Sequence, residues 1–194
     1  RASERLRAWG LLPDWCQTGA QAMGAADPAR SDRASLADVA LQAGQQVLFR
    51  QPLALDFGGI AKGYAVDNAA TLLHRCGIAH ANISAGGDSR VMGNRRGRPW
   101  AIGIRDPREP GKVIALLPLE DTSISTSGDY ERFFEQGGKR FHHLIDPTSG
   151  ESPTAVRSVT ILGEDGLTTE ALSKCVFVLG VTRGLQLIEA QPGV

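Results

Sequence analysis

Two adjacent glycines, Gly58 and Gly59, separate a strand-like run from a helix-like run, and this junction constrains how the surrounding chain can fold. Residues 47–49 are apolar and predict a short strand. A helical spacing of apolar residues begins at Ile60 and ends at Gly77, a common helix stop. The expected apolar face of this helix consists of Ile60, Tyr64 and Leu72, widened by Val66, Ala69, Ala70 and Leu73.

The first turn of this predicted helix contains a lysine, Lys62, where the helix dipole disfavours a cation. A phosphate bound at the helix start would explain the lysine, and glycines without Cβ atoms would let such a ligand approach the backbone. A plain strand-to-helix turn, with the lysine extended into solvent, is the alternative. The segment is neither a Walker A loop nor a GxGxxG fingerprint, so taken alone it favours the structural interpretation.

The charge balance of the chain argues against a nucleic-acid-binding protein. Its 194 residues include 21 Lys and Arg against 21 Asp and Glu, which gives a formal net charge of zero. The hydrophobic content of 42% and the 23 glycines are typical of a loop-rich globular enzyme. No apolar run approaches the length of a membrane span. The length suits a single domain, and we expect one over residues 1–194 with an irregular N-terminal segment over 1–35.

The three cysteines predict neither a metal site nor a disulfide framework, because they are far apart and odd in number. Cys16 lies in the irregular N-terminal segment. Cys76 and Cys175 lie in apolar helical contexts, and we expect both to be buried.

Strands are predicted in the middle of the chain, with helices before and after them. The predicted strands are residues 81–84, 90–92, 100–104, 113–119, a segment within 140–147, and 158–162. A helix over residues 170–179 is capped by Thr168 or Thr169 and ends at Gly180, and residues 185–189 suggest a further helix. This order predicts an α+β or mixed α/β fold, in which a sheet is packed by helices.

Two further segments have polar side chains that a ligand could use. Asp88 follows a second glycine pair, and residues 122–130 (TSISTSGDY) offer many small hydroxyl donors, as a phosphate or sugar would need. A hairpin around Asp88 and a strand with a Ser/Thr turn are the structural alternatives.

His142 and His143 would point to opposite faces of a strand, so one of them could face a site. Two adjacent histidines on a strand cannot easily share one metal ion. A lone histidine in this setting is more often structural than catalytic.

Several motifs occur in an order and at intervals that together resemble the bacterial FAD:protein FMN transferases, the ApbE family. They are residues 56–67 (DFGGIAKGYAVD), 84–88 (SAGGD), 126–130 (TSGDY), 142–147 (HHLIDP), 158–160 (SVT) and the helix over 171–180. The resemblance covers about residues 36–185 and implies a predominantly antiparallel sheet flanked by helices, in a T-fold-like architecture. Trp9 and Gly10 resemble a pair ahead of the family's first strand, so we expect a family-type N-terminal region to be missing before Arg1.

The resemblance implies that FAD is bound with a divalent metal ion on its pyrophosphate, that FMN is passed to a Ser or Thr hydroxyl of an acceptor protein, and that AMP leaves. Mg²⁺ is the expected metal. In the family pattern, Asp56 and Lys62 match FAD contacts, and Lys62 would face the pyrophosphate. Ser127 and Gly128 would line the same cleft, and Leu144 would contact the flavin or ribityl group through its backbone.

His143 matches the histidine that helps to deprotonate the acceptor hydroxyl, a role that suits a neutral imidazole. Gly59 matches a backbone carbonyl that binds the metal. The C-terminal helix of the family supplies an Asp and, four residues later, a Thr as metal ligands, and here these positions hold Glu170 and Lys174. An ammonium cannot bind Mg²⁺.

Three interpretations of this departure remain open. Lys174 could pair with Glu170 and leave no metal site. Lys174 could instead replace the charge of the metal beside the pyrophosphate. Alternatively, Glu170, Ser173 and the Gly59 carbonyl could still hold Mg²⁺. We expect impaired metal binding with retained flavin binding.

The expected function is therefore that of a flavin transferase acting on FAD and on an acceptor protein with a Ser or Thr flavinylation site. A non-catalytic FAD-binding or carrier protein, or an FAD pyrophosphatase, is the alternative on the same scaffold. The resemblance also predicts a location in the cell envelope or periplasm, and the cytoplasm is the alternative.

Overall fold

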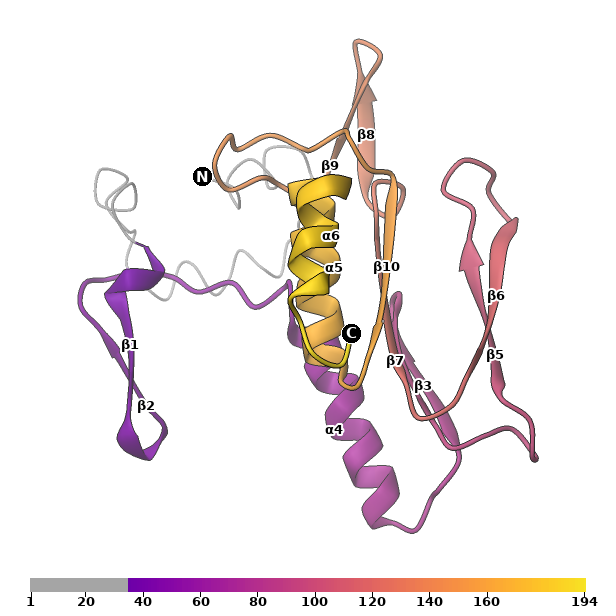
Figure 1. Ribbon diagram of the computed structural model, residues 1–194. Helices are drawn as coiled ribbons and strands as arrows, with labels where there is room; N and C mark the ends of the chain where they lie inside the picture. The colour runs from indigo at the N-terminus through magenta and orange to yellow at the C-terminus, as the bar shows by residue number, and fades with distance from the viewer. Residues whose placement is uncertain (1–34) are drawn as a thin grey trace. The chain divides into compact units, whose positions relative to one another are not determined.

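The computed structural model describes residues 35–194, which form two compact units, 35–56 and 57–194 (Figure 1). Each unit is described by itself. The predictions made for Trp9, Gly10 and Cys16, and for nearly all of the 1–35 segment, lie outside the described residues.

The first unit is built on an antiparallel hairpin of β1 (Val39–Gln42) and β2 (Gln46–Phe49). It begins with the short 3-10 helix η1 (Leu36–Asp38), and a second one, η2 (Ala43–Gln45), forms the turn of the hairpin. The predicted strand over residues 47–49 is confirmed as part of β2.

The second unit contains a four-stranded antiparallel sheet with the strand order β10-β7-β4-β3. Its strands are β3 (Ala81–Ala85), β4 (Asp88–Met92), β7 (Ser123–Gly128) and β10 (Ser158–Gly163). Two separate hairpins pair β5 (Trp100–Arg105) with β6 (Val113–Leu119), and β8 (Phe133–Gln136) with β9 (Lys139–His142). The helices are α4 (Ala61–Arg75), α5 (Gly166–Leu179) and α6 (Val181–Glu189), and α4 and α5 pack on one side of the sheet (Figure 1). The predicted fold class, an antiparallel sheet flanked by helices, is confirmed.

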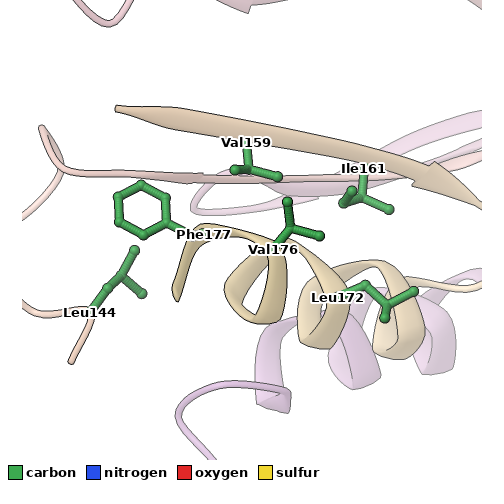
Figure 2. Packing of buried hydrophobic residues seen from close by; sticks show 6 residues of the cluster. All are labelled: Leu144, Val159, Ile161, Leu172, Val176 and Phe177. Atoms are coloured by element: carbon green, nitrogen blue, oxygen red, sulfur yellow. The ribbon is translucent and has the colours of Figure 1, made fainter. Parts of the chain in front are cut away.

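The apolar core lies between α5 and the sheet. Val159 and Ile161 alternate along β10 and face α5, as Figure 2 shows. From α5 the core receives three side chains spaced on one helix face, and Leu144 closes it at one end. The α5 residues of this cluster are Leu172, Val176 and Phe177.

The buried face of α4 agrees with the predicted one only in part. Val66 and Ala70 are buried as predicted, but Tyr64 and Leu72 are 60% and 62% exposed, and Gly63 is buried instead. The reason is the close approach of α5, because a Cβ atom added at Gly63 would lie 2.1 Å from the carbonyl oxygen of Gly166. Two helices this close can only meet through small residues, so the large apolar side chains point elsewhere.

The first turn of α5 is capped from two places. Asp165 accepts a hydrogen bond from the Thr168 N–H at 2.7 Å, so the prediction of Thr168 or Thr169 as the cap is wrong. From α4, the Asp67 carboxylate accepts hydrogen bonds from the backbone N–H groups of Gly166 and Leu167, at 2.8–3.0 Å. Four N–H groups of a helix start have no partner within the helix, and Asp67 supplies the acceptor for two of them.

Both predicted glycine stops are confirmed: Gly77 and Gly180 follow the ends of α4 and α5 with φ angles of 81° and 78°. The predicted burial of the cysteines is wrong, since Cys76 and Cys175 are both exposed. Cys175 lies on the outward side of α5, between the buried positions 173 and 176. Within residues 35–194, no helix has the length and apolar character needed to cross a membrane.

Candidate active site

Three segments that are far apart in the sequence meet around Lys62. Lys62 lies in the first turn of α4, Asp88 begins β4 after the Gly86–Gly87 turn, and Glu170 lies on α5. The Lys62 ammonium forms an ion pair with Asp88, donates a hydrogen bond to the Gly86 carbonyl oxygen at 3.0 Å, and lies 3.9 Å from Glu170 Oε1. Both carboxylates are buried, whereas the Lys62 side chain is 43% exposed. The solvent-facing part of this cluster is therefore cationic.

Both carboxylate oxygens of Glu170 are engaged by donors of the protein itself. Oε2 accepts a hydrogen bond from the Gly63 N–H at 2.7 Å, and Oε1 lies 2.9 Å from Lys174 Nζ. The Lys174 side chain passes over Gly59, because a Cβ atom added there would lie 3.4 Å from Lys174 Cδ.

This arrangement does not fit a divalent metal ion at the predicted ligands Gly59, Glu170 and Ser173. The Lys174 ammonium takes the Glu170 oxygen that a metal would use, and Ser173 Oγ donates a hydrogen bond to the Glu170 carbonyl oxygen at 2.9 Å. Among residues 35–194, no group of three or more His, Cys, Asp or Glu side chains is arranged to hold a metal. We derive no chemical step through a metal ion.

A layer of serine hydroxyls connects Glu170 to the sheet. Because Ser173 Oγ donates to the Glu170 carbonyl, the Ser127 hydroxyl donates to Ser173 Oγ, at 2.8 Å. The Ser125 hydroxyl donates to Asp88 and lies 3.2 Å from Ser173 Oγ. The hydroxyl-rich segment is thus a strand, β7, whose alternate serines Ser125 and Ser127 are buried and bonded to other protein groups.

The two adjacent histidines have different environments. His142 ends β9, where its Nε2 lies 2.9 Å from the Pro153 carbonyl oxygen and its ring packs edge-on against Phe177. These contacts, and the hydrogen bonds that join the His142 backbone N–H and carbonyl oxygen to the Ser152 hydroxyl, make His142 a structural residue. His143 follows the strand, which is shorter than predicted.

The pKa of His143 is lowered to about 4, chiefly because burial disfavours its charged form. A backbone hydrogen bond at Arg132 opposes this shift, and the positive charges of Arg132 and Lys174 add to it. The imidazole is therefore neutral at pH 7, and its Nδ1 has no hydrogen-bond partner among the described residues.

The remaining predicted residues are Leu144, Gly128 and Asp56. Leu144 has its side chain in the apolar core, so a flavin contact could only use its backbone, as predicted. Gly128 ends β7 against the Tyr130 ring, which would lie 2.4 Å from an added Cβ atom. Asp56 belongs to the first unit, so its predicted FAD contact stays a prediction.

Sequence reasoning missed two residues, Gly63 and Ser125, that form hydrogen bonds within the cluster around Lys62. The Gly63 N–H binds Glu170 through the backbone, which leaves no side-chain signal. Ser125 was part of the hydroxyl-rich segment, and its alternation with Ser127 could have indicated that both face the same side of a strand.

Known proteins are similar to this chain over most of its length. A sequence model described as the ApbE family matches residues 5–194. The FAD:protein FMN transferase of Rhodobacter capsulatus is 41% identical over 140 residues, which cover 72% of this chain and 27% of the relative. A Klebsiella pneumoniae (strain 342) protein of the same name is 34% identical over 192 residues, covering 94% of this chain and 54% of the relative.

Solved structures of ApbE proteins are also similar to this chain. The ApbE protein of Thermotoga maritima superposes with a TM-score of 0.72 at 36% identity, covering 80% of this chain and 51% of that one. The flavin transferase ApbE of Vibrio cholerae also gives 0.72, at 34% identity, covering 84% and 52%. This chain thus spans about half or less of the length of these relatives.

Proposed function

This chain belongs to the ApbE family, and on that basis we propose that it transfers FMN from FAD to a Ser or Thr hydroxyl of an acceptor protein. In the proposed reaction, the acceptor oxygen forms a bond to the phosphorus of the FMN half. The bond from that phosphorus to the bridging oxygen breaks, and AMP leaves with the bonding electron pair. The hydroxyl proton passes to a base on the enzyme.

The observation that supports this proposal most directly is the partly exposed ammonium of Lys62 at the start of α4, held in place by buried carboxylates. A fixed cation at a helix N-terminus favours phosphate oxygens, since both the charge and the helix dipole attract an anion. If a pyrophosphate is bound there, the Lys62 ammonium would stabilise the negative charge on the leaving AMP. It would need no rearrangement to do so, because the buried carboxylates already hold it in place.

His143 is the residue that we propose as the base. It is neutral at pH 7, so it can accept a proton, but a base with a pKa of about 4 has little driving force. The negative charges of a bound pyrophosphate would raise its pKa towards neutrality and make it a better base once FAD is in place. In this proposal, His143 therefore becomes an effective base only when FAD is bound.

Mg²⁺ receives no role in this proposal, because the Glu170 oxygen that it would need is paired with Lys174. The location in the cell envelope stays a prediction.

The test is to incubate the protein with FAD and candidate acceptor proteins and to measure released AMP and covalent flavin fluorescence on a denaturing gel. We expect AMP and acceptor-bound flavin in equal amounts. His143→Ala should remove both while leaving FAD affinity nearly unchanged, and His74→Ala, at an exposed histidine on α4, is the matched control. AMP without labelled acceptor would indicate a pyrophosphatase, and bound but intact FAD would indicate a carrier.

A further inference from the structure

The protein itself holds a cation, the Lys174 ammonium, beside Glu170. Nζ lies 2.9 Å from Glu170 Oε1 and 3.3 Å from the Glu170 carbonyl oxygen. The aliphatic part of the side chain lies over Gly59, where no Cβ atom interferes. Only 23% of the Lys174 side chain is exposed, so packing as well as charge keeps the ammonium in place.

The charges around this ammonium already balance. Two buried carboxylates, Asp88 and Glu170, face two ammonium groups, Lys62 and Lys174. A divalent cation added here would either leave an excess positive charge in a poorly solvated region or would have to displace Lys174 from Glu170. Both outcomes are unfavourable, because unpaired charges in such a region are strongly penalised.

Each ammonium group also keeps a donor for a ligand. An ammonium has three N–H donors, and Lys174 directs two of them to Glu170. Lys62 donates one to the Gly86 carbonyl oxygen and forms an ion pair with Asp88. Each lysine therefore has one remaining donor with no partner identified among residues 35–194. Two phosphates joined by one bridging oxygen present acceptors that could use both.

We propose that Lys174 is a built-in cation, so that this chain binds the pyrophosphate of a dinucleotide without a divalent metal ion. The inference rests on the proposed function for its ligand, FAD. Lys174 supplies the positive charge beside Glu170, and Lys62 supplies the second charge at the start of α4.

The first experiment measures FAD affinity by calorimetry, with Mg²⁺ and with EDTA. The affinity of the wild-type protein should change by less than about twofold between the two conditions. Lys174→Met, which keeps the aliphatic chain and removes the charge, should lower the affinity about tenfold or more, since a charge-assisted hydrogen bond is lost. Lys112→Met is the matched control, because Lys112 forms an exposed ion pair with Glu109 on the same chain.

The second experiment needs no FAD and measures Mn²⁺ binding by electron paramagnetic resonance. The wild-type protein should bind no Mn²⁺ at Glu170. Lys174→Thr, which removes the ammonium and adds an oxygen ligand, should gain one Mn²⁺ site that the further change Glu170→Gln abolishes. Circular dichroism of each variant would verify that it is folded.

Three results would overturn the inference: FAD binding by the wild-type protein that requires Mg²⁺, wild-type Mn²⁺ binding that Glu170→Gln abolishes, or no gain of Mn²⁺ binding in Lys174→Thr. A wild-type protein that binds no FAD in either condition would instead count against the proposed function. In that case the Mn²⁺ measurement still decides whether Lys174 fills the cation position.

Discussion

Two side chains of α5 are both fully buried, yet they differ in chemistry. The C-terminal half contributes Phe177, fully buried among apolar side chains, and the N-terminal half contributes Glu170, fully buried among polar ones. Burial alone therefore does not separate core from site. A buried carboxylate is costly unless it is bonded, and a chain that keeps one where an apolar residue would fit indicates a function for that position.

The apolar half should give the largest loss of stability. Phe177→Ala removes a fully buried ring that packs against His142, Val176 and β10, and should lower the free energy of unfolding by about 3–5 kcal/mol. Chemical denaturation measures this, with Leu185→Ala on exposed α6 as the control. FAD affinity of the folded fraction should not change. A loss of affinity as large as that of Glu170→Ala would remove the distinction between the two halves.

The polar half should respond differently. Glu170→Ala leaves the Gly63 N–H and Lys174 without their partner and should lower the free energy of unfolding by about 3 kcal/mol. Combining Glu170→Leu with Lys174→Met removes both charges and should be more stable than Glu170→Leu alone, by about 1–2 kcal/mol. Denaturation of the three variants measures this. If the double variant is the least stable of the three, the unpaired charge of Lys174 is not the main reason why Glu170→Leu loses stability.

The contact between α4 and α5 should tolerate no added methyl group. Gly63→Ala places a Cβ atom 2.1 Å from the Gly166 carbonyl oxygen, so the helices must separate, at a cost of about 1–3 kcal/mol. Because Glu170 binds the Gly63 N–H, the shift should also weaken FAD binding. Ala65→Leu, on the exposed face of α4, is the control and should change stability little. Equal stability of Gly63→Ala and the control would contradict the close contact.

Between pH 6 and 7, the smallest effect is expected from protonation of His143. The native pKa of His143 is about 4, below its ordinary value of 6.5, so between these values the unfolded chain binds a proton that the native protein does not. The contribution of His143 to the free energy of unfolding is therefore fully present above pH 6.5 and is lost as the pH falls to about 4. Over this range, the slope of the free energy of unfolding against pH corresponds to at most about one proton from this residue. His143→Gln should make the slope shallower, as measured by denaturation at several pH values. Some slope should persist, because burial also lowers the pKa of His142.

The sequence predicted the three helices and most of the strands, because helix stops and strand alternation are local signals, but it missed β1 and β8 and gave β7 only as an alternative. Gly77 and Gly180 fixed the ends of α4 and α5 without reference to other parts of the chain. The buried face of α4 was predicted only in part, since Val66 and Ala70 are buried as expected but Tyr64 and Leu72 are not. Tyr64 and Leu72 are apolar at helical spacing, but the partner of α4 approaches at Gly63, and only the folded chain reveals which face it covers.

The candidate site was predicted in part. The motifs indicated Lys62, Glu170 and Ser173, and the structure brings Lys62 and Ser173 to the same glutamate. Backbone donors such as the Gly63 N–H have no sequence signal, and the pairing of Lys174 with Glu170 was one of three open interpretations. The geometry shows that both carboxylate oxygens of Glu170 have partners, and the effect of this on metal and flavin binding stays a prediction.

The carboxylate of Asp67, on α4, binds the start of a helix that lies far along the chain. It receives the first N–H groups of α5 from residues 99 and 100 positions further on. The first turn of α5 is thus complete only after α4 has formed and the intervening strands have brought the two helices together. Contacts over such sequence separations are formed slowly, so we expect α5, and Glu170 with it, to be completed late in folding.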